Sequence, residues 1–168
     1  YPKLFKQLYV LYVIFFLQTA KIIVTANIGD SRALIVRSDG KSRELTKDHK
    51  PTMRSEFERV HNEFGKLNKE NRIDGVLAVA RALGDYSVYG VGKKPDLNEF
   101  YLDENDKYLV IGCDGVFDVL SNDDVARVAM NASSTTEAAF IIRNAAFASL
   151  SSDNISVIVV DLTKYVSN

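Results

Sequence analysis

The stretch YLVIGCDGVFDVLS, residues 108–121, combines two features that bear on the fold and on the function. Its first part, 108–112, is a short and continuous apolar run, which is typical of a strand covered on both faces. The run is followed by Asp114 and Gly115, a pair that is common in chain reversals. The pair therefore has two interpretations: an ordinary turn, or a carboxylate held at the end of a sheet to bind a ligand.

Two helices are predicted between this run and the next apolar run, residues 154–162. The first begins at Ser121, where SNDD matches a capping box with acidic residues in the first turn. The second begins near Ser134, where STTE repeats the pattern. Its apolar residues at helical spacing are expected to face the core; they are Ala138, Ile141, Ile142 and Ala145.

Three strands are predicted earlier in the chain. The segments 21–29 and 32–38 are rich in β-branched residues and are separated by a turn at 29–31. Asp39-Gly40 then predicts a tight hairpin into 41–46. We expect the three strands to form a meander. Strands grouped first and helices inserted later favour an α+β fold.

After Pro51 the spacing of the apolar residues becomes helical. The residues at this spacing are Met53, Phe57, Val60 and Phe64, and Gly65 is placed to end the helix. The polar stretch 66–75 is expected to be a loop. Residues 88–100 could form a loop on the substrate side with Lys93 and Lys94, although a solvated charged loop is the favoured explanation of these lysines.

The N-terminal run LYVLYVIFFL, residues 8–17, is apolar throughout. It is too short for a transmembrane helix, which needs roughly 20 residues. Three interpretations stay open: a buried strand, the apolar part of a signal peptide after Lys3 and Lys6, or a truncation scar or gene-model artefact. Because the chain begins with Tyr1 rather than Met, we expect further sequence upstream.

The composition excludes several classes of protein. With 168 residues, 46% of them hydrophobic, the chain suits one globular domain or one piece of a domain. A net charge of −1 offers no basic face to nucleic acid. The single cysteine, Cys113, allows no intrachain disulfide and favours a reducing compartment, cytoplasmic or nuclear. A cysteine phosphatase would need a basic loop after Cys113, where the sequence reads DGVFDV.

Three aspartates share one kind of setting, and a fourth follows one of them closely in the sequence. Asp114, Asp153 and Asp30 each lie at the end of a predicted strand, and Asp118 would face the same side as Asp114 if DGVFD forms a helical turn. Carboxylates brought together repel one another, and no cluster of Arg or Lys flanks them in the sequence. Mg²⁺ or Mn²⁺ would compensate the charge, whereas zinc prefers His or Cys. Each aspartate taken singly is also a normal turn residue.

Five segments, in this order, carry a resemblance to a known family: ANIGDSRALIV, LTKDHKP, GVLAVARALGD, LVIGCDGVFDVLSNDD and SSDNISVIVVDL. They resemble the metal-dependent protein serine/threonine phosphatases of the protein phosphatase 2C family, over roughly residues 22–162. The resemblance implies a four-layer α-β-β-α sandwich, in which helices flank two antiparallel sheets. Residues 1–21 do not resemble the family, and 22–168 are expected to form an incomplete catalytic domain whose N-terminal part is missing.

The resemblance also implies a metal site. Asp114 and Asp153 resemble ligands of a binuclear Mg²⁺ or Mn²⁺ centre, which activates water for direct attack on phosphorus. Asp30 and Asp118 resemble ligands of a third, more weakly held ion. In LTKDHKP and RALGD, no direct chemical step is assigned to His49, Arg81 and Asp85, which are expected to pack, to form turns or to anchor a flap.

The chain departs from the family's pattern in its upstream part. The family's phosphate-binding Arg, its general acid and its Asp-Gly-His-Gly segment are expected upstream, and no Asp-Gly-His run occurs here. No catalytic residue is therefore assigned in this chain. Within the match, Ala80 stands where Ser is more usual, a change expected to matter little.

We therefore expect the full-length product to be a monomeric phosphatase of phosphoproteins that engages neither nucleic acid nor membrane. This chain alone should have little or no activity. A non-catalytic pseudophosphatase acting as a binding or scaffold module is the open alternative. Aspartate-nucleophile phosphohydrolases are disfavoured because they need an Asp two positions from the first, and here those positions hold Gly112 and Val116.

Overall fold

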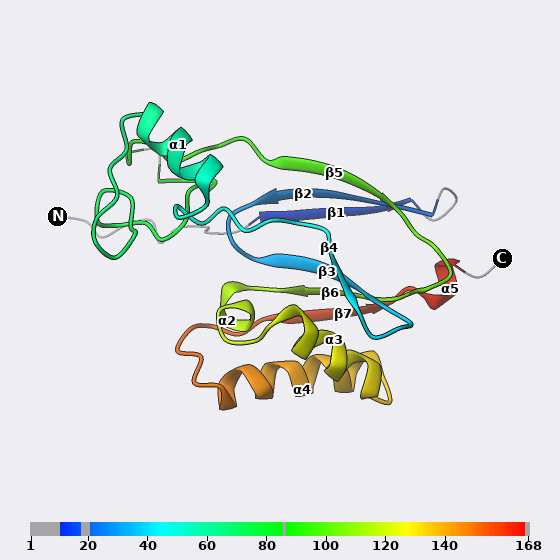
Figure 1. The fold of residues 1–168 in the computed structure, drawn as a ribbon. Coiled ribbons are helices and arrows are strands. Elements are labelled where there is room, and N and C mark those ends of the chain that lie inside the picture. The colour runs from blue at the N-terminus through cyan, green and yellow to red at the C-terminus, as the bar shows by residue number, and fades with distance from the viewer. Residues whose placement is uncertain (1–10, 18–20, 86, 167–168) are drawn as a thin grey trace. The chain divides into compact units, whose positions relative to one another are not determined.

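The computed structural model describes residues 11–17, 21–85 and 87–166 (Figure 1). In chain order the elements are β1 (Leu11–Leu17), β2 (Ile22–Ile28), β3 (Arg32–Arg37), β4 (Ser42–Glu44), α1 (Arg54–Asn62), β5 (Asp96–Tyr101), β6 (Asp106–Gly112), α2 (Asp114–Phe117), α3 (Asn122–Asn131), α4 (Thr135–Ala148), β7 (Val157–Asp161) and α5 (Thr163–Val166). They form one sheet of order β1-β2-β5 and another of order β4-β3-β6-β7. The predicted α+β class, with two antiparallel sheets and helices, is confirmed.

The chain divides into two compact units. The first contains Ala26–Asp30 and Asp48–Leu97, and the second contains Ile14–Thr25, Ser31–Lys47 and the chain from Asn98 onward. Strands β1, β2 and β5 contribute residues to both units. Each unit has its own apolar core.

The second unit is built on the four-stranded sheet. Strand β3 pairs antiparallel with β4 and β6, and β6 pairs antiparallel with β7. In this register Leu34 lies opposite Val110, and Val110 lies opposite Val159. Strand β6 therefore occupies an interior position, which agrees with its prediction as a continuous apolar strand.

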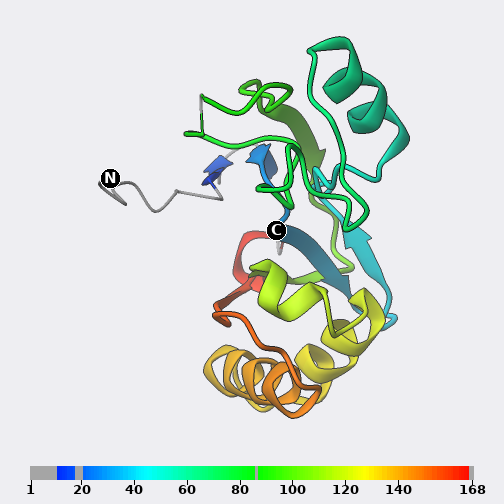
Figure 2. The ribbon, with the colours of Figure 1, turned by 90° about the vertical axis from the view of Figure 1, so that its left-hand side faces the viewer.

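Alternate residues of the central strands enter two different cores. Leu34 and Val36 face the helices, where they pack with residues of α3 and α4 such as Val125 and Ile142. Figure 2 shows these two helices side by side on one face of the sheet. Residues on the opposite face of the same strands, including Ala33 and Ile35, pack with Ile23, Leu45, Leu102 and Leu109. Burial on both faces explains why these strands lack the apolar-polar alternation of a half-exposed sheet.

The predicted meander is wrong in one respect. The hairpin between β3 and β4 forms as expected, but β2 belongs to the other sheet, next to β1 and β5. Gly29 has a positive φ of 111°, a conformation that residues with a side chain rarely adopt. At this turn the chain leaves one sheet and enters the other, which the composition of the two strands does not reveal.

The two predicted helix starts are confirmed. Ser121 accepts a hydrogen bond from the Asp124 N–H, and the Asp124 side chain bonds back to the Ser121 N–H, which completes a capping box at α3. Ser134 accepts from the Glu137 N–H at the start of α4. One inward residue was predicted wrongly, because Ile141 is 38% exposed. The buried stripe of α4 consists of Ala138, Ile142 and Ala146, and Ala145 is partly buried beside it.

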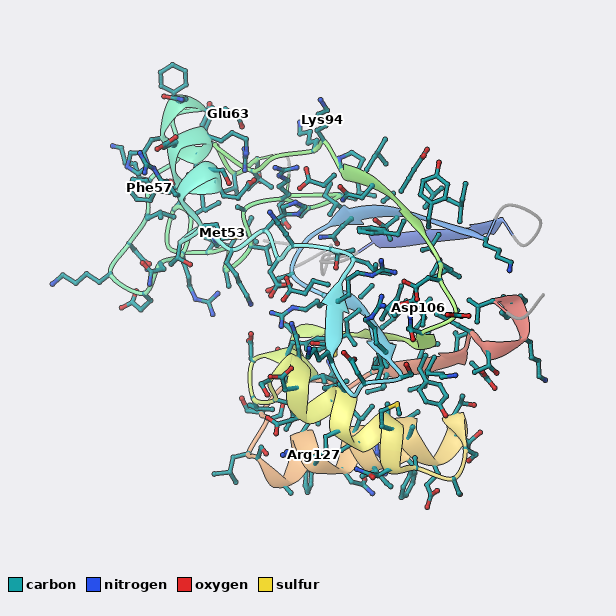
Figure 3. All side chains as sticks on the ribbon, turned by 45° about the vertical axis from the view of Figure 1, so that its right-hand side comes forward. Met53, Phe57, Glu63, Lys94, Asp106 and Arg127 are labelled. Carbon is teal, nitrogen blue, oxygen red and sulfur yellow. The ribbon has the colours of Figure 1, made fainter. Side chains whose placement is uncertain are left out.

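The first unit contains α1 and the loops that follow it. Helix α1 forms where predicted, and the Gly65 N–H bonds the Val60 carbonyl at its end. However, Phe57 is 44% exposed on α1 (Figure 3), and Phe64 is 83% exposed. The residues that α1 buries are Glu56 and Val60. The core of the unit gathers small and branched side chains, namely Val60, Ile73, Leu77, Val79, Ala80, Ala82 and Val91.

The N-terminal apolar run forms a strand over residues 11–17, which is β1. This observation favours the strand interpretation for that part of the run, while residues 8–10 lie outside the described residues. Among the helices that the structure describes, none combines the length and the apolar character needed to cross a bilayer.

Candidate metal centre

Asp114 lies where β6 ends and the chain turns into α2. Strand β6 ends at Gly112, Cys113 precedes the helix, and Asp114 is its first residue. The side chain is half-buried, and its Oδ1 accepts the N–H of Gly115 at 2.8 Å. The carboxylate is therefore held at the end of an interior strand, as the second interpretation of the Asp-Gly pair requires.

The loop that carries Asp153 lies against this turn. The Cys113 N–H donates to the Ser156 carbonyl at 3.2 Å, and the Cys113 Sγ donates to the Asn154 carbonyl at 3.0 Å. A Cβ atom added to Gly115 would lie 2.3 Å from the Asn154 carbonyl oxygen and 3.5 Å from the Cβ of Asp153. Residues 41 positions apart in the chain are thus brought together because position 115 carries no side chain.

Asp118 stands on the same turn as Asp114. Its N–H donates to the Asp114 carbonyl at 2.8 Å, which is the spacing of a helical turn. DGVFD therefore forms the predicted turn, and Asp118 is exposed at its end.

Asp30 belongs to the first unit, in the turn between β2 and β3. Its side chain is 3% exposed, and Lys50 Nζ lies 2.5 Å from its Oδ2. Although no Arg or Lys cluster flanks Asp30 in the sequence, the fold supplies a lysine from 20 positions away. Asp114, Asp118 and Asp153 belong to the second unit, so that a metal site shared by all four aspartates stays a prediction.

The carboxylate oxygens of the predicted ligands are of the chemical type that a hard divalent cation prefers. The described part of the chain contains no group of three or more His, Cys, Asp or Glu side chains that could hold a metal ion. Mg²⁺ is commonly bound by one or two carboxylates and keeps several waters. Asp114 and Asp153 supply two such carboxylates on adjoining loops, and Gly115 leaves no side chain between them.

The first unit contains a buried polar network that starts at His49. Its Nδ1 accepts the N–H of Gly29 at 3.1 Å, and its Nε2 lies 3.1 Å from Asp96 Oδ2. Because a backbone N–H only donates, Nδ1 carries no proton, and Nε2 donates its proton to Asp96. The imidazole is therefore neutral.

Arg81 extends this network from Asp96 to Glu56. Its Nη1 donates to Asp96 at 2.7 Å, and its Nη2 donates to Glu56 Oε1 at 2.5 Å. Arg59 Nη2 donates to the other Glu56 oxygen at 2.9 Å. Glu56 is 2% exposed, and pairing of both oxygens offsets the cost of burying its charge.

These contacts shift the pKa values of the network. Burial lowers the pKa of His49 below its ordinary 6.5, and the hydrogen bond to Asp96 opposes this shift only in part. For Glu56, burial would raise the pKa, but the hydrogen bonds from Arg81 and Arg59 outweigh it and lower the pKa below 4.5. For Asp96, burial is likewise outweighed by His49 and Arg81, and its pKa falls below 3.8.

Sequence reasoning missed Glu56 and Asp96, which look like ordinary surface charges beside Arg54, Arg59 and Lys94. His49 and Arg81 were expected to act as packing or anchoring residues, and the structure places both in the network. Asp85 has a φ of 51°, and its carbonyl accepts the Val88 N–H at 2.9 Å, which describes a tight turn.

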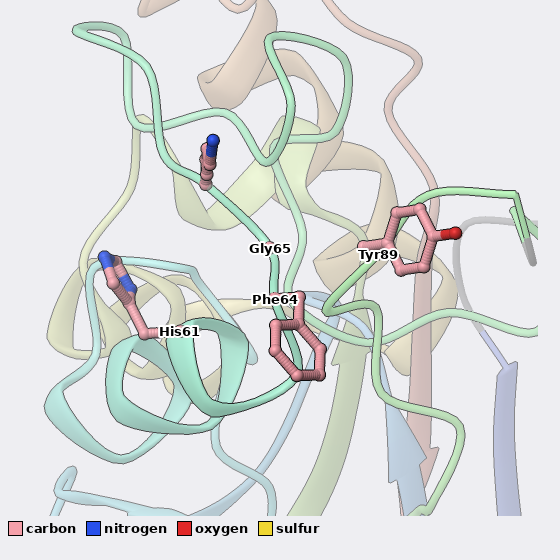
Figure 4. A pocket seen from close by; sticks show the side chains of 5 residues that line it. His61, Phe64, Gly65 and Tyr89 are labelled. Atoms are coloured by element: carbon pink, nitrogen blue, oxygen red, sulfur yellow. The ribbon is translucent and has the colours of Figure 1, made fainter.

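A hollow of about 610 Å³ lies on the first unit, lined by His61, Phe64, Gly65, Lys66 and Tyr89 (Figure 4). Phe64 and Tyr89 are largely exposed at its rim. None of its lining side chains is a carboxylate, so it does not offer the donor chemistry found at Asp114 and Asp153.

Solved structures with the same fold include phosphatases. A phosphatase from a pathogenic strain of Toxoplasma gondii matches with a TM-score of 0.75 and 32% identity, over 82% of this chain and 47% of that chain. A sex-determining protein of C. elegans matches with a TM-score of 0.79 and 27% identity, over 88% of this chain and 38% of the other.

The family model for protein phosphatase 2C matches residues 11–155. The protein phosphatase 2C homolog 1 of Schizosaccharomyces pombe is 41% identical over 149 residues, which are 88% of this chain and 42% of that protein. The chain therefore belongs to the protein phosphatase 2C family. It spans less than half the length of this yeast relative. The match begins inside the N-terminal apolar run, and the domain boundary expected between residues 21 and 22 stays a prediction.

Proposed function

We propose that the full-length protein hydrolyses phosphoserine and phosphothreonine on proteins, and that Asp114 and Asp153 hold a metal ion for this reaction. One observation carries the proposal: the turn after β6 and the loop before β7 meet, with an aspartate on each. Membership of the protein phosphatase 2C family supports the reaction class.

The residues of this chain would act by binding and positioning. Asp114 and Asp153 would hold Mg²⁺ or Mn²⁺ from adjacent loops, and Asp118 and Asp30 would serve a further, weaker ion. When bound, the metal would lower the pKa of a water so that it can act as the nucleophile, and it would offset charge on the phosphoryl oxygens. Cys113 takes no part as a nucleophile, because its Sγ bonds the Asn154 carbonyl and accepts the Ser156 N–H.

The test is hydrolysis of a phosphothreonine peptide by the full-length protein in Mn²⁺. We expect turnover by the wild type and a loss of roughly 100-fold or more in Asp114→Asn, because one metal ligand is removed. Asp123→Asn is the matched control, since Asp123 is an exposed residue of α3. Turnover that survives Asp114→Asn, or an inactive wild type that binds partners, would favour the scaffold alternative.

The same assay on this chain alone should give little or no turnover. The upstream carboxylate that the family uses to bridge its two metals does not occur in these residues. Robust turnover by the isolated chain, abolished by Asp114→Asn, would show that the upstream part is dispensable.

We also propose a cytoplasmic or nuclear location and a monomeric state with phosphoprotein substrates. The single cysteine supports a reducing compartment, and the net charge of −1 gives no reason to expect nucleic acid as a partner.

A further inference from the structure

His49 holds both polar backbone groups of Gly29. The His49 N–H donates to the Gly29 carbonyl at 2.8 Å, and the Gly29 N–H donates to His49 Nδ1 at 3.1 Å. A single residue therefore fixes the peptide units on either side of Gly29, whose positive φ already restricts the turn. The next residue in the chain is Asp30.

His49 is in turn fixed to the body of the first unit. Its carbonyl accepts the N–H of Ala80 at 2.7 Å, and Ala80 is a fully buried core residue. Its Nε2 donates to Asp96, which Arg81 holds from the other side. Since His49 is only 2% exposed, its ring is not accessible to solvent or to a substrate.

From these contacts we infer that His49 is a positioning residue: it holds the backbone of the Gly29-Asp30 turn, so that the Asp30 carboxylate, which also pairs with Lys50 Nζ at 2.5 Å, is presented to a divalent cation. The lone pair on Nδ1 holds the turn directly, because it accepts the Gly29 N–H. The hydrogen bond from Nε2 to Asp96 only orients the ring, so that an acceptor in the place of Nδ1 should be sufficient to hold the turn. The inference rests on the proposed function, because it assumes that Asp30 is a metal ligand.

Two substitutions of His49 distinguish the hydrogen bond at Nδ1 from the hydrogen bond at Nε2. In His49→Asn the amide oxygen can take the place of Nδ1 and accept the Gly29 N–H, but it does not reach Asp96. In His49→Gln the amide nitrogen can take the place of Nε2 and donate to Asp96, but the Gly29 acceptor is lost. His49→Ala removes both, and His61→Asn is the control on an exposed histidine of α1.

The first readout is amide hydrogen exchange at Gly29 without metal. We expect exchange to rise roughly tenfold in His49→Gln and His49→Ala, and to stay near wild type in His49→Asn and His61→Asn. Exchange at Ala80 should stay slow in His49→Gln and His49→Asn, because its partner is the His49 backbone carbonyl. This pattern would show a loosened turn in a folded unit. Unchanged exchange at Gly29 in His49→Ala would overturn the inference.

The second readout is Mn²⁺ binding to the full-length protein, measured by electron paramagnetic resonance. The part of the binding that Asp30→Asn removes should also weaken in His49→Gln and His49→Ala, and be restored in His49→Asn. If Asp30→Asn changes no Mn²⁺ binding, or if His49→Ala leaves the Asp30-dependent part intact, the inference is overturned. Failure of the proposed function is seen separately, as phosphatase turnover that survives Asp114→Asn.

Discussion

At residue 115 the lack of a side chain allows a close approach between two loops, the turn after β6 and the loop before β7. Gly115 lies in the first turn of α2 without a positive φ, so that its backbone would accept other residues. Glycine is favoured here for a steric reason, because the Asn154 carbonyl oxygen occupies the space that the Cβ atom of any other residue would need. The two loops that carry Asp114 and Asp153 meet at this contact.

Gly115→Ala tests the contact. Helix propensity alone would favour alanine by about 1 kcal/mol. We expect the clash to outweigh this gain and to lower the free energy of unfolding by about 1–3 kcal/mol, as in other overpacked sites. Mn²⁺ binding should also be weaker. Urea denaturation measures the first effect.

Gly40→Ala is the control for this substitution. Gly40 has a φ of +78° and no atom within 4 Å of its added Cβ, so it reports backbone strain without a clash. A Gly115→Ala protein as stable as wild type would show that the loops do not approach as described.

The residue scale also shows what the sequence could and could not predict. The sequence pattern predicts Asp114 at the end of an apolar strand, whereas a metal site shared with Asp153 is implied only by the family resemblance and stays a prediction. The pairing of Asp30 with Lys50, and that of Glu56 with Arg81, joins residues 20 and 25 positions apart. No local pattern marks such pairs, because each residue alone looks like a solvated charge.

At the scale of elements, local signals predicted well and long-range pairing did not. The starts of α3 and α4 depend on residues three apart, so that Ser121 and Ser134 identified them. Strands β2 and β3 were recognised by composition, but their placement in different sheets depends on partners far along the chain. The exposed Phe57 of α1 was misleading for a similar reason, since the buried neighbour Glu56 pairs with Arg81, which lies 25 positions further along the chain.

Ser121→Ala tests the capping box of α3. The substitution removes the acceptor of the Asp124 N–H, and we expect a loss of about 1 kcal/mol in unfolding free energy. In a chain of this length that loss corresponds to a fall of roughly 2–4 °C in the midpoint of thermal unfolding. Ser152→Ala, in an exposed loop, should leave the midpoint unchanged. Equal midpoints for Ser121→Ala and wild type would contradict the cap.

At the scale of the whole molecule, the network of the first unit should make stability sensitive to acid. His49 has a lowered pKa in the folded state. Below about pH 6.5 the imidazole is therefore protonated more readily in the unfolded chain than in the folded chain, which lowers the free energy of unfolding. The groups facing His49 are Asp96, Arg81 and Glu56. Glu56 and Asp96 also have lowered pKa values, and their stabilising contribution is lost as the pH falls below about 4.5 and 3.8.

All three groups therefore act in the same direction. The unfolding free energy should decline from pH 7 to pH 5 and decline further toward pH 3. His49→Gln should remove the first part of the decline and keep the second. Urea denaturation across this pH range is the measurement, and a stability that stays constant or rises between pH 7 and pH 5 would contradict the burial of a neutral His49.

The most direct test of the central claim is a Mn²⁺ titration of the full-length protein and its Asp114→Asn, Asp153→Asn and doubly substituted variants by isothermal calorimetry. If both carboxylates hold one ion, each single substitution should weaken the tightest binding step by roughly 100-fold or more. The double substitution should then add little, because the ion is already lost. Tight Mn²⁺ binding that survives in both single variants would contradict the claim that Asp114 and Asp153 meet around a metal.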